Sequence, residues 1–345
     1  MKTPRGSVLI VVLFVMVVLG LTGLSLAYRV GLEMKSVQRR AIMAKLLCGA
    51  KSAVAIAMAR LGENVNDFDH PAEPWCAHAP LAGEGWIPEW TEGTGRAPPE
   101  CVVDYHVIDE EGKLNVLCAS SDALERIGLS PEQIAALFDW MDSDDVARAG
   151  GAENAFYENR PSSHRCKSAP LELLEELLLI RGFDSSGWLA EDANANGVLD
   201  PPEDDGDATY PPDNADGRLD LGWVAMLTCF GYGQINLNTA PGTVLLTLPL
   251  SDGAVNQILA FRAFDENSSG LLAEHVFRSA VDIDQLQGLT DADREVLRQI
   301  AAYRSEHFRI IAEARQARTG LSCRLEVVVR QSDGAVEILQ WREGA

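Results

Sequence analysis

The sequence predicts an α+β protein. An N-terminal transmembrane helix continues into a domain built from one helix and an antiparallel sheet, and a large all-α domain is inserted between the strands. Three observations predict this class. The N-terminus carries an uncharged apolar stretch, strand-like segments occur both before residue 120 and after residue 303, and the residues between them show helical patterning.

The N-terminal stretch from Ser7 to Tyr28 contains no charged residue. A helix of this length, rising about 1.5 Å per residue, is long enough to cross a hydrocarbon core of about 30 Å. A secretory signal has a shorter apolar core of roughly 7–15 residues. Beyond the stretch, no proline interrupts a series of apolar residues at helical spacing, namely Ile42, Leu46, Ala50, Val54 and Ala57. We therefore predict one helix that continues to about Leu61.

Charges around this helix predict its orientation and exclude one class of partner. Lys2 and Arg5 precede the apolar stretch and favour a cytoplasmic N-terminus, although Arg29 beyond it weakens the bias. The bulk of the chain is then expected outside the cytoplasm. The net charge of −22 argues against nucleic acid, because phosphate binding needs a basic surface. Cations are the expected counterpart.

Two groups of strand-like segments flank the middle of the chain. Before it, apolar runs at Val102–Ile108 and Leu114–Leu117 surround the turn Asp109-Glu110-Glu111-Gly112, which predicts a hairpin. After it, three segments alternate imperfectly between apolar and polar residues: HFRIIAEARQ, LSCRLEVVVRQ and AVEILQWRE. Ser332-Asp333-Gly334 joins the last two. These strands are expected to form a small sheet on the exposed half of the long helix.

The helical region, residues 121–303, contains a repeat. DALERIGLSPEQIAALFDWMD and TVLLTLPLSDGAVNQILAFRA each predict a helix, a short turn and a second helix. Such units resemble helix-hairpin-helix motifs, many of which bind DNA phosphates. Here the hairpin LPLSDG is acidic and lacks a glycine directly after its proline, so DNA binding is not predicted. The acidic run Glu172, Glu175 and Glu176 is expected on the solvated face of a further helix.

The segment DANANGVLDPPE has the spacing of an EF-hand calcium loop. Its predicted ligands are Asp192, Asn194, Asn196, the Val198 carbonyl, Asp200 and Glu203, with Gly197 at the sharp turn. These are all oxygen donors, which suit a hard cation; calcium is preferred over magnesium, which needs a tighter octahedron. A solvated acidic loop is the alternative. Pro201 and Pro202 argue against the flanking helices of a true EF-hand.

A weaker candidate metal site follows within the same acidic loop, residues 191–220. Its potential ligands are Asp213, Asn214, Asp216 and Asp220, around a turn at Gly217. The final loop position falls on Trp223 and offers no carboxylate. These residues form a second site, join the first, or lie in solvent; the sequence leaves the choice open.

Motifs for catalysis are missing from the sequence. There is no HExxH, GxSxG or Cys-His signature, and the seven cysteines show no CxxC pair. A cluster formed by Asp139, Asp142, Asp144 and Asp145 has the composition of an acid pair, but these residues are expected to cap a turn and to contact Arg148. No enzymatic activity is predicted.

The N-terminus resembles that of type IV pilins and type II secretion pseudopilins, in which a short basic leader ends in glycine before an apolar helix. The resemblance implies that residues 1–6 are a prepilin leader and that a prepilin peptidase cuts between Gly6 and Ser7. Most such subunits carry a glutamate at the fifth mature position, which is thought to neutralise a neighbour's N-terminal amine. Here that position is Val11, so a place at the end of the filament is expected rather than one along its shaft.

The rest of the chain resembles the general secretion pathway protein K family, minor pseudopilins of type II secretion. The strings that carry this resemblance are FDWMDSDD, GGAENAFY, KSAPLELLEELLLIRGF, INLNTAP and ILQWRE. It implies a pilin-like fold with a first part at 29–120 and C-terminal strands at 304–345, around an inserted α-domain.

The resemblance also implies a function. The expected role is a minor pseudopilin at the pseudopilus tip, which initiates assembly with other minor pseudopilins and supports export of folded proteins. The expected location is the inner membrane, with a single pass at 7–28 and the bulk of the chain in the periplasm. The alternative is a membrane-anchored periplasmic binding protein with a calcium-stabilised recognition loop.

Overall fold

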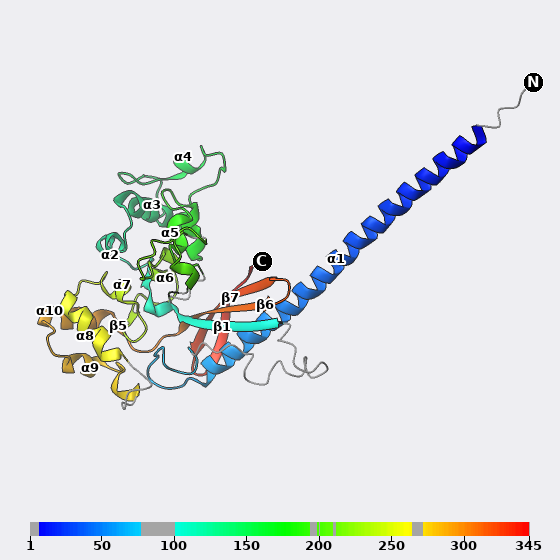
Figure 1. The fold of residues 1–345 in the computed structure, drawn as a ribbon. Coiled ribbons are helices and arrows are strands. Elements are labelled where there is room, and N and C mark those ends of the chain that lie inside the picture. Colours follow the sequence, from blue (N-terminus) through cyan, green and yellow to red (C-terminus); the bar gives the residue numbers. More distant parts are fainter. Residues whose placement is uncertain are drawn as a thin grey trace, which may run out of the picture.

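A single long helix dominates one end of the molecule (Figure 1). The computed structural model describes residues 7–76, 101–193, 199, 201–209, 212–263 and 272–344. The helix, α1, spans Ser7–Glu63 and contains 57 residues, which corresponds to a length of about 85 Å at 1.5 Å per residue. It ends two residues after the predicted Leu61. Its N-terminal half projects away from the rest of the chain, and its C-terminal half carries a sheet.

The sheet has four antiparallel strands in the order β1-β6-β7-β8. Their bounds are β1 Cys101–Asp109, β6 His307–Gln316, β7 Ser322–Ser332 and β8 Ala335–Gly344. The predicted C-terminal strands are thus confirmed. Asp333 and Gly334 connect β7 to β8 with φ angles of 50° and 80°, as a two-residue hairpin turn requires.

The first core lies between α1 and the sheet. Leu46, Ala50, Val54, Ala57 and Leu61 of α1 are buried against apolar residues of β1, β6 and β7. Small residues let the helix approach closely: a Cβ at Gly49 would lie 3.0 Å from Val103 Cγ2. The apolar spacing of the sequence therefore does bury this half of the helix, as predicted.

The predicted hairpin at residues 102–117 is wrong. β1 pairs with β6, whereas β2 (Leu114–Asn115) pairs in parallel with β3 (Leu227–Thr228). A short 3-10 helix, η3 (Glu110–Gly112), separates β1 from β2, and the Asp109 carboxylate accepts a hydrogen bond from the Glu111 N–H. Its glutamates are buried against residues that are distant in sequence, rather than exposed in a turn. The chain after η3 therefore does not fold back along β1.

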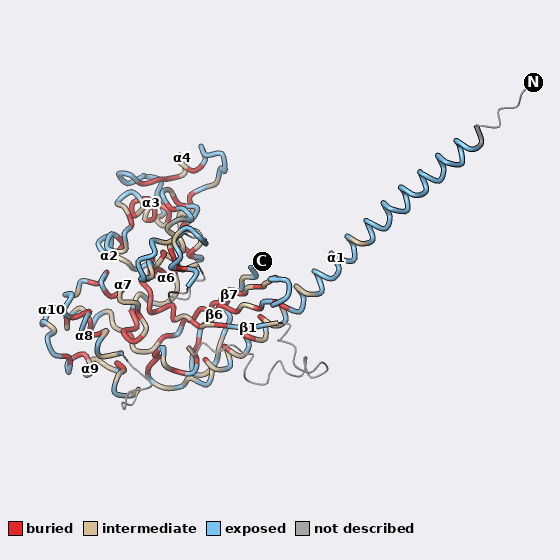
Figure 2. The backbone as a smooth tube through the Cα atoms, in the orientation of Figure 1, coloured by how far each residue is buried: buried red, intermediate tan, exposed pale blue. Residues whose placement is uncertain are grey.

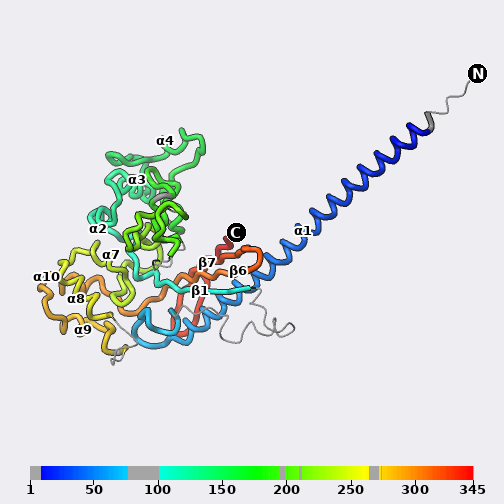
Figure 3. The backbone as a smooth tube through the Cα atoms, viewed as in Figure 1, coloured from blue at the N-terminus to red at the C-terminus, as the bar shows by residue number. Residues whose placement is uncertain are grey.

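The region between β1 and β6 is rich in short helices and has its own core. In addition to η3, β2 and β3, it contains α2 (Ser121–Arg126), α3 (Pro131–Met141), α4 (Asn154–Tyr157), η4 (Leu174–Leu179), α5 (Ser186–Leu189), η5 (Pro201–Glu203), α6 (Trp223–Met226), β4 (Ile235–Asn236), α7 (Gly242–Leu245), α8 (Asp252–Arg262), η6 (Leu272–Glu274), α9 (Ala280–Gln285), α10 (Asp291–Ile300) and β5 (Ala301–Ala302). β4 and β5 pair in parallel. This inserted region lies at the end of the sheet farthest from the N-terminal tip of α1 (Figure 3).

The two predicted helix-turn-helix units are present as α2-α3 and α7-α8. The second helix of each begins with a serine cap: Ser130 accepts a hydrogen bond from Gln133 N, and Ser251 accepts one from Ala254 N. The segment after the first unit differs from the prediction, because η4 is a 3-10 helix and its acidic residues are not simply solvated. Glu176 accepts from Lys167 Nζ at 2.8 Å.

Candidate functional site

The N-terminal half of α1 is an apolar surface that no other described part of the chain covers (Figure 2). Val11, the position of the expected glutamate, is 59 % exposed, and the first turn of the helix contains no acidic residue. By length and composition, α1 is a helix able to cross a membrane. An uncovered apolar surface of this size is stable only in a bilayer or against other helices. Gly6 lies outside the described residues, and Ser7 begins α1.

The acidic loop is closed at its base by a bridge between Ala190 and Leu221. Glu191, which was not among the predicted ligands, organises the loop from within: its carboxylate accepts hydrogen bonds from Asn214 N at 2.8 Å and from Asp220 N at 3.0 Å. The loop therefore returns to its own start, with a buried carboxylate at the closure.

The predicted first and last calcium ligands, Asp192 and Glu203, are both buried, with 0 % and 3 % of their surface exposed. Charged carboxylates are seldom buried unless they are paired or bind a metal. Burial at both ends of the predicted loop is compatible with a cation site, and both residues also interact with other groups of the protein. The four ligands between them, Asn194, Asn196, Val198 and Asp200, lie outside the described residues.

The second predicted group folds tight local turns. Asp213 accepts from the backbone N–H groups of Asp205, Gly206 and Ala215. Asn214 Oδ1 accepts from Asp216 N, and its side-chain amide donates to Asp220 Oδ2 at 3.2 Å. The four residues are thus brought within one short segment, where their oxygens bind neighbouring backbone and side-chain groups.

The turn before α8 contacts a carboxylate that belongs to another helix, α10. Asp293, in the first turn of α10, accepts hydrogen bonds from Ser251 N at 2.8 Å and from Ser251 Oγ at 3.0 Å. The Thr290 hydroxyl and the Ser251 N–H lower the pKa of Asp293 to about 2. A carboxylate at this helix N-terminus occupies the place where a phosphate would bind, which argues against nucleic-acid binding by this hairpin.

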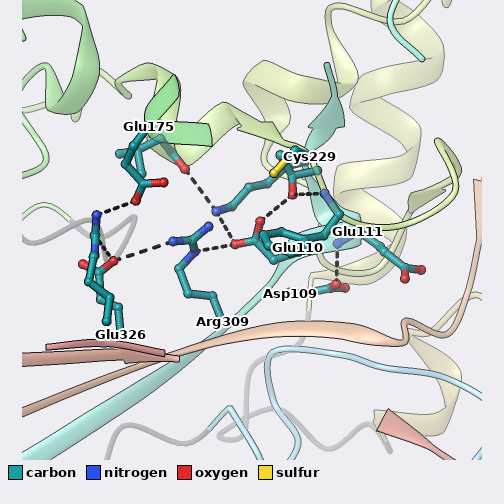
Figure 4. A network of polar contacts seen from close by, with 12 residues as sticks. Asp109, Glu110, Glu111, Glu175, Cys229, Arg309 and Glu326 are labelled. Atoms are coloured by element: carbon teal, nitrogen blue, oxygen red, sulfur yellow. Dashed lines mark hydrogen bonds and ion pairs between the residues drawn. The ribbon is translucent and has the colours of Figure 1, made fainter. Parts of the chain in front are cut away.

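A buried ionic network joins the sheet to the inserted region (Figure 4). Glu110 of η3 accepts from Arg309 Nε on β6 at 2.7 Å and from Lys113 Nζ at 2.9 Å. At the other end of the network, Arg342 on β8 pairs with both Glu326 on β7 and Glu175 of η4. Because its members come from three strands and two 3-10 helices, the network fixes the orientation of the inserted region on the sheet.

The INLNTAP segment supplies a second buried connection. Asn236 and Thr239 donate to the Asp109 carboxylate at 3.1 Å and 2.6 Å, and the Ser305 hydroxyl donates to the same carboxylate at 2.6 Å. Burial raises the pKa of Asp109 to about 6. Asn238 bonds the backbone N–H and C=O of Phe277. These polar residues therefore have a structural role: they connect the INLNTAP segment to the end of β1 and to Phe277.

Sequence reasoning missed the roles of Glu110 and Arg309 and found that of Arg148. Arg309 lies within the apolar strand HFRIIAE, and a base in such a strand is a signal for a buried acidic partner. As predicted, Arg148 contacts the acidic cluster: its guanidinium bonds Asp139 at 2.7 Å and also pairs with Asp142.

The comparisons with known proteins agree with this architecture. Residues 117–190 match the family model described as type II secretion system (T2SS), protein K, which confirms the family resemblance of the sequence. A chain of the crystal structure of the GspK-GspI-GspJ complex from the enterotoxigenic Escherichia coli type 2 secretion system is similar over 90 % of this chain and 99 % of that chain. The TM-score is 0.55 and the identity 13 %, so this likeness concerns the fold. No curated protein matches the chain.

Proposed function

We propose that this chain, a type II secretion protein of the K family by its match over residues 117–190, is a minor pseudopilin that occupies the tip of the pseudopilus. There it initiates assembly with other minor pseudopilins and supports the export of folded proteins. The observation that carries the proposal is the uncovered apolar N-terminal half of α1, the stem, joined to the sheet and the inserted region, which together form the head and have the fold of a chain in the solved complex. An apolar stem with a folded head is built to insert among other stems.

Partner subunits are proposed from the same helix. Leu9, Phe14 and Leu19 are each more than 60 % exposed along the stem, and their burial against neighbouring helices would stabilise an assembly through close packing. The solved complex with a similar fold contains three subunits, GspK, GspI and GspJ. We propose that homologous subunits surround this stem after residues 1–6 have been removed by a prepilin peptidase.

Two features support the tip location. Val11 offers no carboxylate to the N-terminal amine of an adjacent subunit, so a neighbour stacked on this stem would leave a charge uncompensated in an apolar environment. The inserted region adds bulk at the end of the head farthest from the stem (Figure 1). A terminal subunit tolerates both features, whereas a repeated one does not.

The proposed membrane arrangement follows from the charges. Lys2 and Arg5 would hold the N-terminus in the cytoplasm, and α1 would cross the inner membrane once and place the head in the periplasm. In that compartment calcium is proposed to order the acidic loop through Asp192 and Glu203, whose burial supports a bound cation. The ion would stiffen the loop and take part in no chemistry.

Processing of the N-terminus tests this proposal. The full chain is expressed with a prepilin peptidase, extracted from membranes, and its intact mass is measured. The expected product begins at Ser7, and a Gly6→Val variant keeps residues 1–6. Gly20→Ala is the control, because a Cβ at Gly20 meets no atom within 4 Å. Retention of residues 1–6 in the parent chain would contradict a pseudopilin.

Location is tested separately by labelling the inserted region on assembled pseudopili and imaging the label. One label at one end of each fibre is the expected result. Labels at regular intervals along the fibre would contradict the tip location while leaving membership of the pseudopilus intact.

A further inference from the structure

We propose that Asp139, Asp142 and Glu153 bind a divalent cation, calcium foremost, at a site in the inserted region that is separate from the acidic loop. One carboxylate oxygen from each residue can be chosen so that all three lie within 4.8 Å of one another. Oxygen donors alone suit a hard cation. Two of the three side chains are almost fully buried, with 0 % exposure at Asp139 and 4 % at Glu153.

The local fold gathers these three residues from two helix ends. Asp139 lies in the last turn of α3, and Asp142 caps the C-terminus of that helix. Glu153 occupies the N-cap position of α4, yet its side chain makes no capping hydrogen bond. Instead its carboxylate points toward the two aspartates. The arrangement is therefore not explained by helix capping.

The state of the buried Glu153 carboxylate indicates that a ligand binds here. Within the part of the chain that the structure describes, no N–H or O–H group donates to either of its oxygens or to Oδ1 of Asp142. The Cys166 thiol interacts with Glu153 but donates its hydrogen bond to the Asp139 carbonyl oxygen at 3.5 Å, and a thiol is a weak donor. Leaving a buried carboxylate unpaired costs free energy, so these oxygens are suited to receive a cation.

Arg148 neutralises part of this cluster, and its backbone N–H also donates to both oxygens of Asp139, at 3.3 Å and 3.1 Å. It pairs with Oδ1 of Asp139 and Oδ2 of Asp142, and it does not contact Glu153 in any pair that the structure describes. One guanidinium beside three carboxylates leaves two negative charges, which equals the charge of a divalent cation. The Arg148 side chain is 46 % exposed, so it can shift as an ion enters.

Gly151 makes the close packing of this site possible. A Cβ on this residue would lie 2.0 Å from Oδ2 of Asp139, so any side chain here would displace that carboxylate. The Gly151 carbonyl accepts a hydrogen bond from Arg181 at 2.8 Å, and this bond holds the segment in place. Calcium takes six to eight oxygens, so the carboxylates would supply part of its shell and water the remainder.

Calcium titration of the full chain in detergent tests the site. The parent for this experiment carries Asp192→Ala and Glu203→Ala, so that the acidic loop does not contribute. Glu153→Gln is expected to weaken calcium binding by about tenfold or more, because it removes one charged ligand. Glu158→Gln is the matched control, since Glu158 is exposed and pairs with Arg165 outside the cluster. Equal affinity of the Glu153→Gln chain and its parent would overturn the proposal.

Thermal unfolding separates a ligand from a merely structural residue. Without calcium, Glu153→Gln is expected to raise the melting temperature, because it relieves repulsion among three carboxylates. With saturating calcium the order is expected to reverse. The same stability change with and without calcium would overturn the proposal.

Two further measurements complete the test. If Glu153→Gln fails to fold, Asp142→Asn, at a partly exposed position, provides the same comparison under the same criteria. Tighter binding of magnesium than of calcium would overturn the assignment to calcium, and weaker binding would support it.

Discussion

Arg309 on β6 directs its Nε at the Glu110 carboxylate, 2.7 Å away, and both side chains are buried at the junction between the sheet and the inserted region. Lys113 Nζ binds the same oxygen, Oε1 of Glu110, at 2.9 Å. Burial alone would raise the pKa of Glu110, but the charges of Arg309 and Lys113 outweigh it and hold this pKa well below its ordinary value. One carboxylate therefore pairs with two buried bases, and Glu326, whose Oε2 lies 3.6 Å from Arg309 Nη1, supplies a second negative charge.

Glu110→Gln is expected to destabilise the head by about 3–5 kcal/mol, because it removes the carboxylate that pairs with buried Lys113 and leaves buried Arg309 with only its longer pair to Glu326. Denaturant unfolding of the full chain in detergent, followed by tryptophan fluorescence, measures this loss. Glu337→Gln is the control, since Glu337 forms an exposed pair with Arg330 and such pairs contribute about 1 kcal/mol or less. Similar losses in both variants would show that the buried network does not hold the head together.

Asp69 is expected to make the head less stable as the pH rises. Burial, assisted by Asp109 and Glu73, raises the pKa of Asp69 to about 8, whereas an unfolded aspartate has a pKa of about 3.9. Between these values the folded state binds more protons than the unfolded state, so the free energy of unfolding falls with increasing pH.

Asp69→Asn is expected to flatten this dependence, and urea midpoints between pH 4 and pH 8 measure it. The amide keeps an oxygen that can accept from the Ser305 N–H, as the Asp69 carboxylate does at 2.6 Å. Asp67→Asn, at an exposed position two residues earlier, is expected to change nothing. A pH slope in Asp69→Asn equal to that of the parent would refute the assignment.

Asp293 is expected to act in the opposite direction. The Thr290 hydroxyl and the Ser251 N–H lower its pKa to about 2, so the stability it contributes is present above about pH 4 and is lost as the pH falls toward 2. Asp293→Ala is expected to cost about 1–2 kcal/mol through the lost caps of α8 and α10.

Asp291→Ala provides the control at the same helix end, because Asp291 is exposed in the first turn of α10. It removes the same charge beside the helix dipole without removing the bonds to Ser251. Acid unfolding between pH 5 and pH 2 compares the two variants. A loss as large in Asp291→Ala would assign the effect to charge at the helix end rather than to the bridging carboxylate.

Local patterns predicted those parts of the fold whose causes are local. The uninterrupted apolar series sets the length of α1, and the Asp333-Gly334 turn connects β7 to β8 with both φ angles positive. Ser130 and Ser251 begin helices where the sequence places a cap before an apolar run. In each case the residues that decide the structure are neighbours along the chain.

The junction could not be predicted in this way, because its partners are far apart in sequence. Glu110 and Arg309 are separated by 199 positions, and DEEG between two apolar runs has the composition of an exposed turn. The same applies to Glu153 in the candidate cation cluster. Its neighbours along the chain show only a helix start, and its unpaired carboxylate becomes apparent once α3 and α4 are placed together.

The acidic loop yields the last prediction, because composition indicated a cation there and the structure adds buried carboxylates at both ends. In a Glu153→Gln chain, which silences the separate cluster, Asp192→Ala and Glu203→Ala are each expected to weaken calcium binding strongly. Asp207→Ala, at an exposed position in the same loop, is the control for net charge. Removing calcium with a chelator is expected to speed proteolysis within residues 191–220, since carboxylates without a cation repel one another. Cleavage at the same rate with and without calcium, together with unchanged affinity in Asp192→Ala, would contradict a bound cation and assign the order of the loop to hydrogen bonds such as those of Glu191.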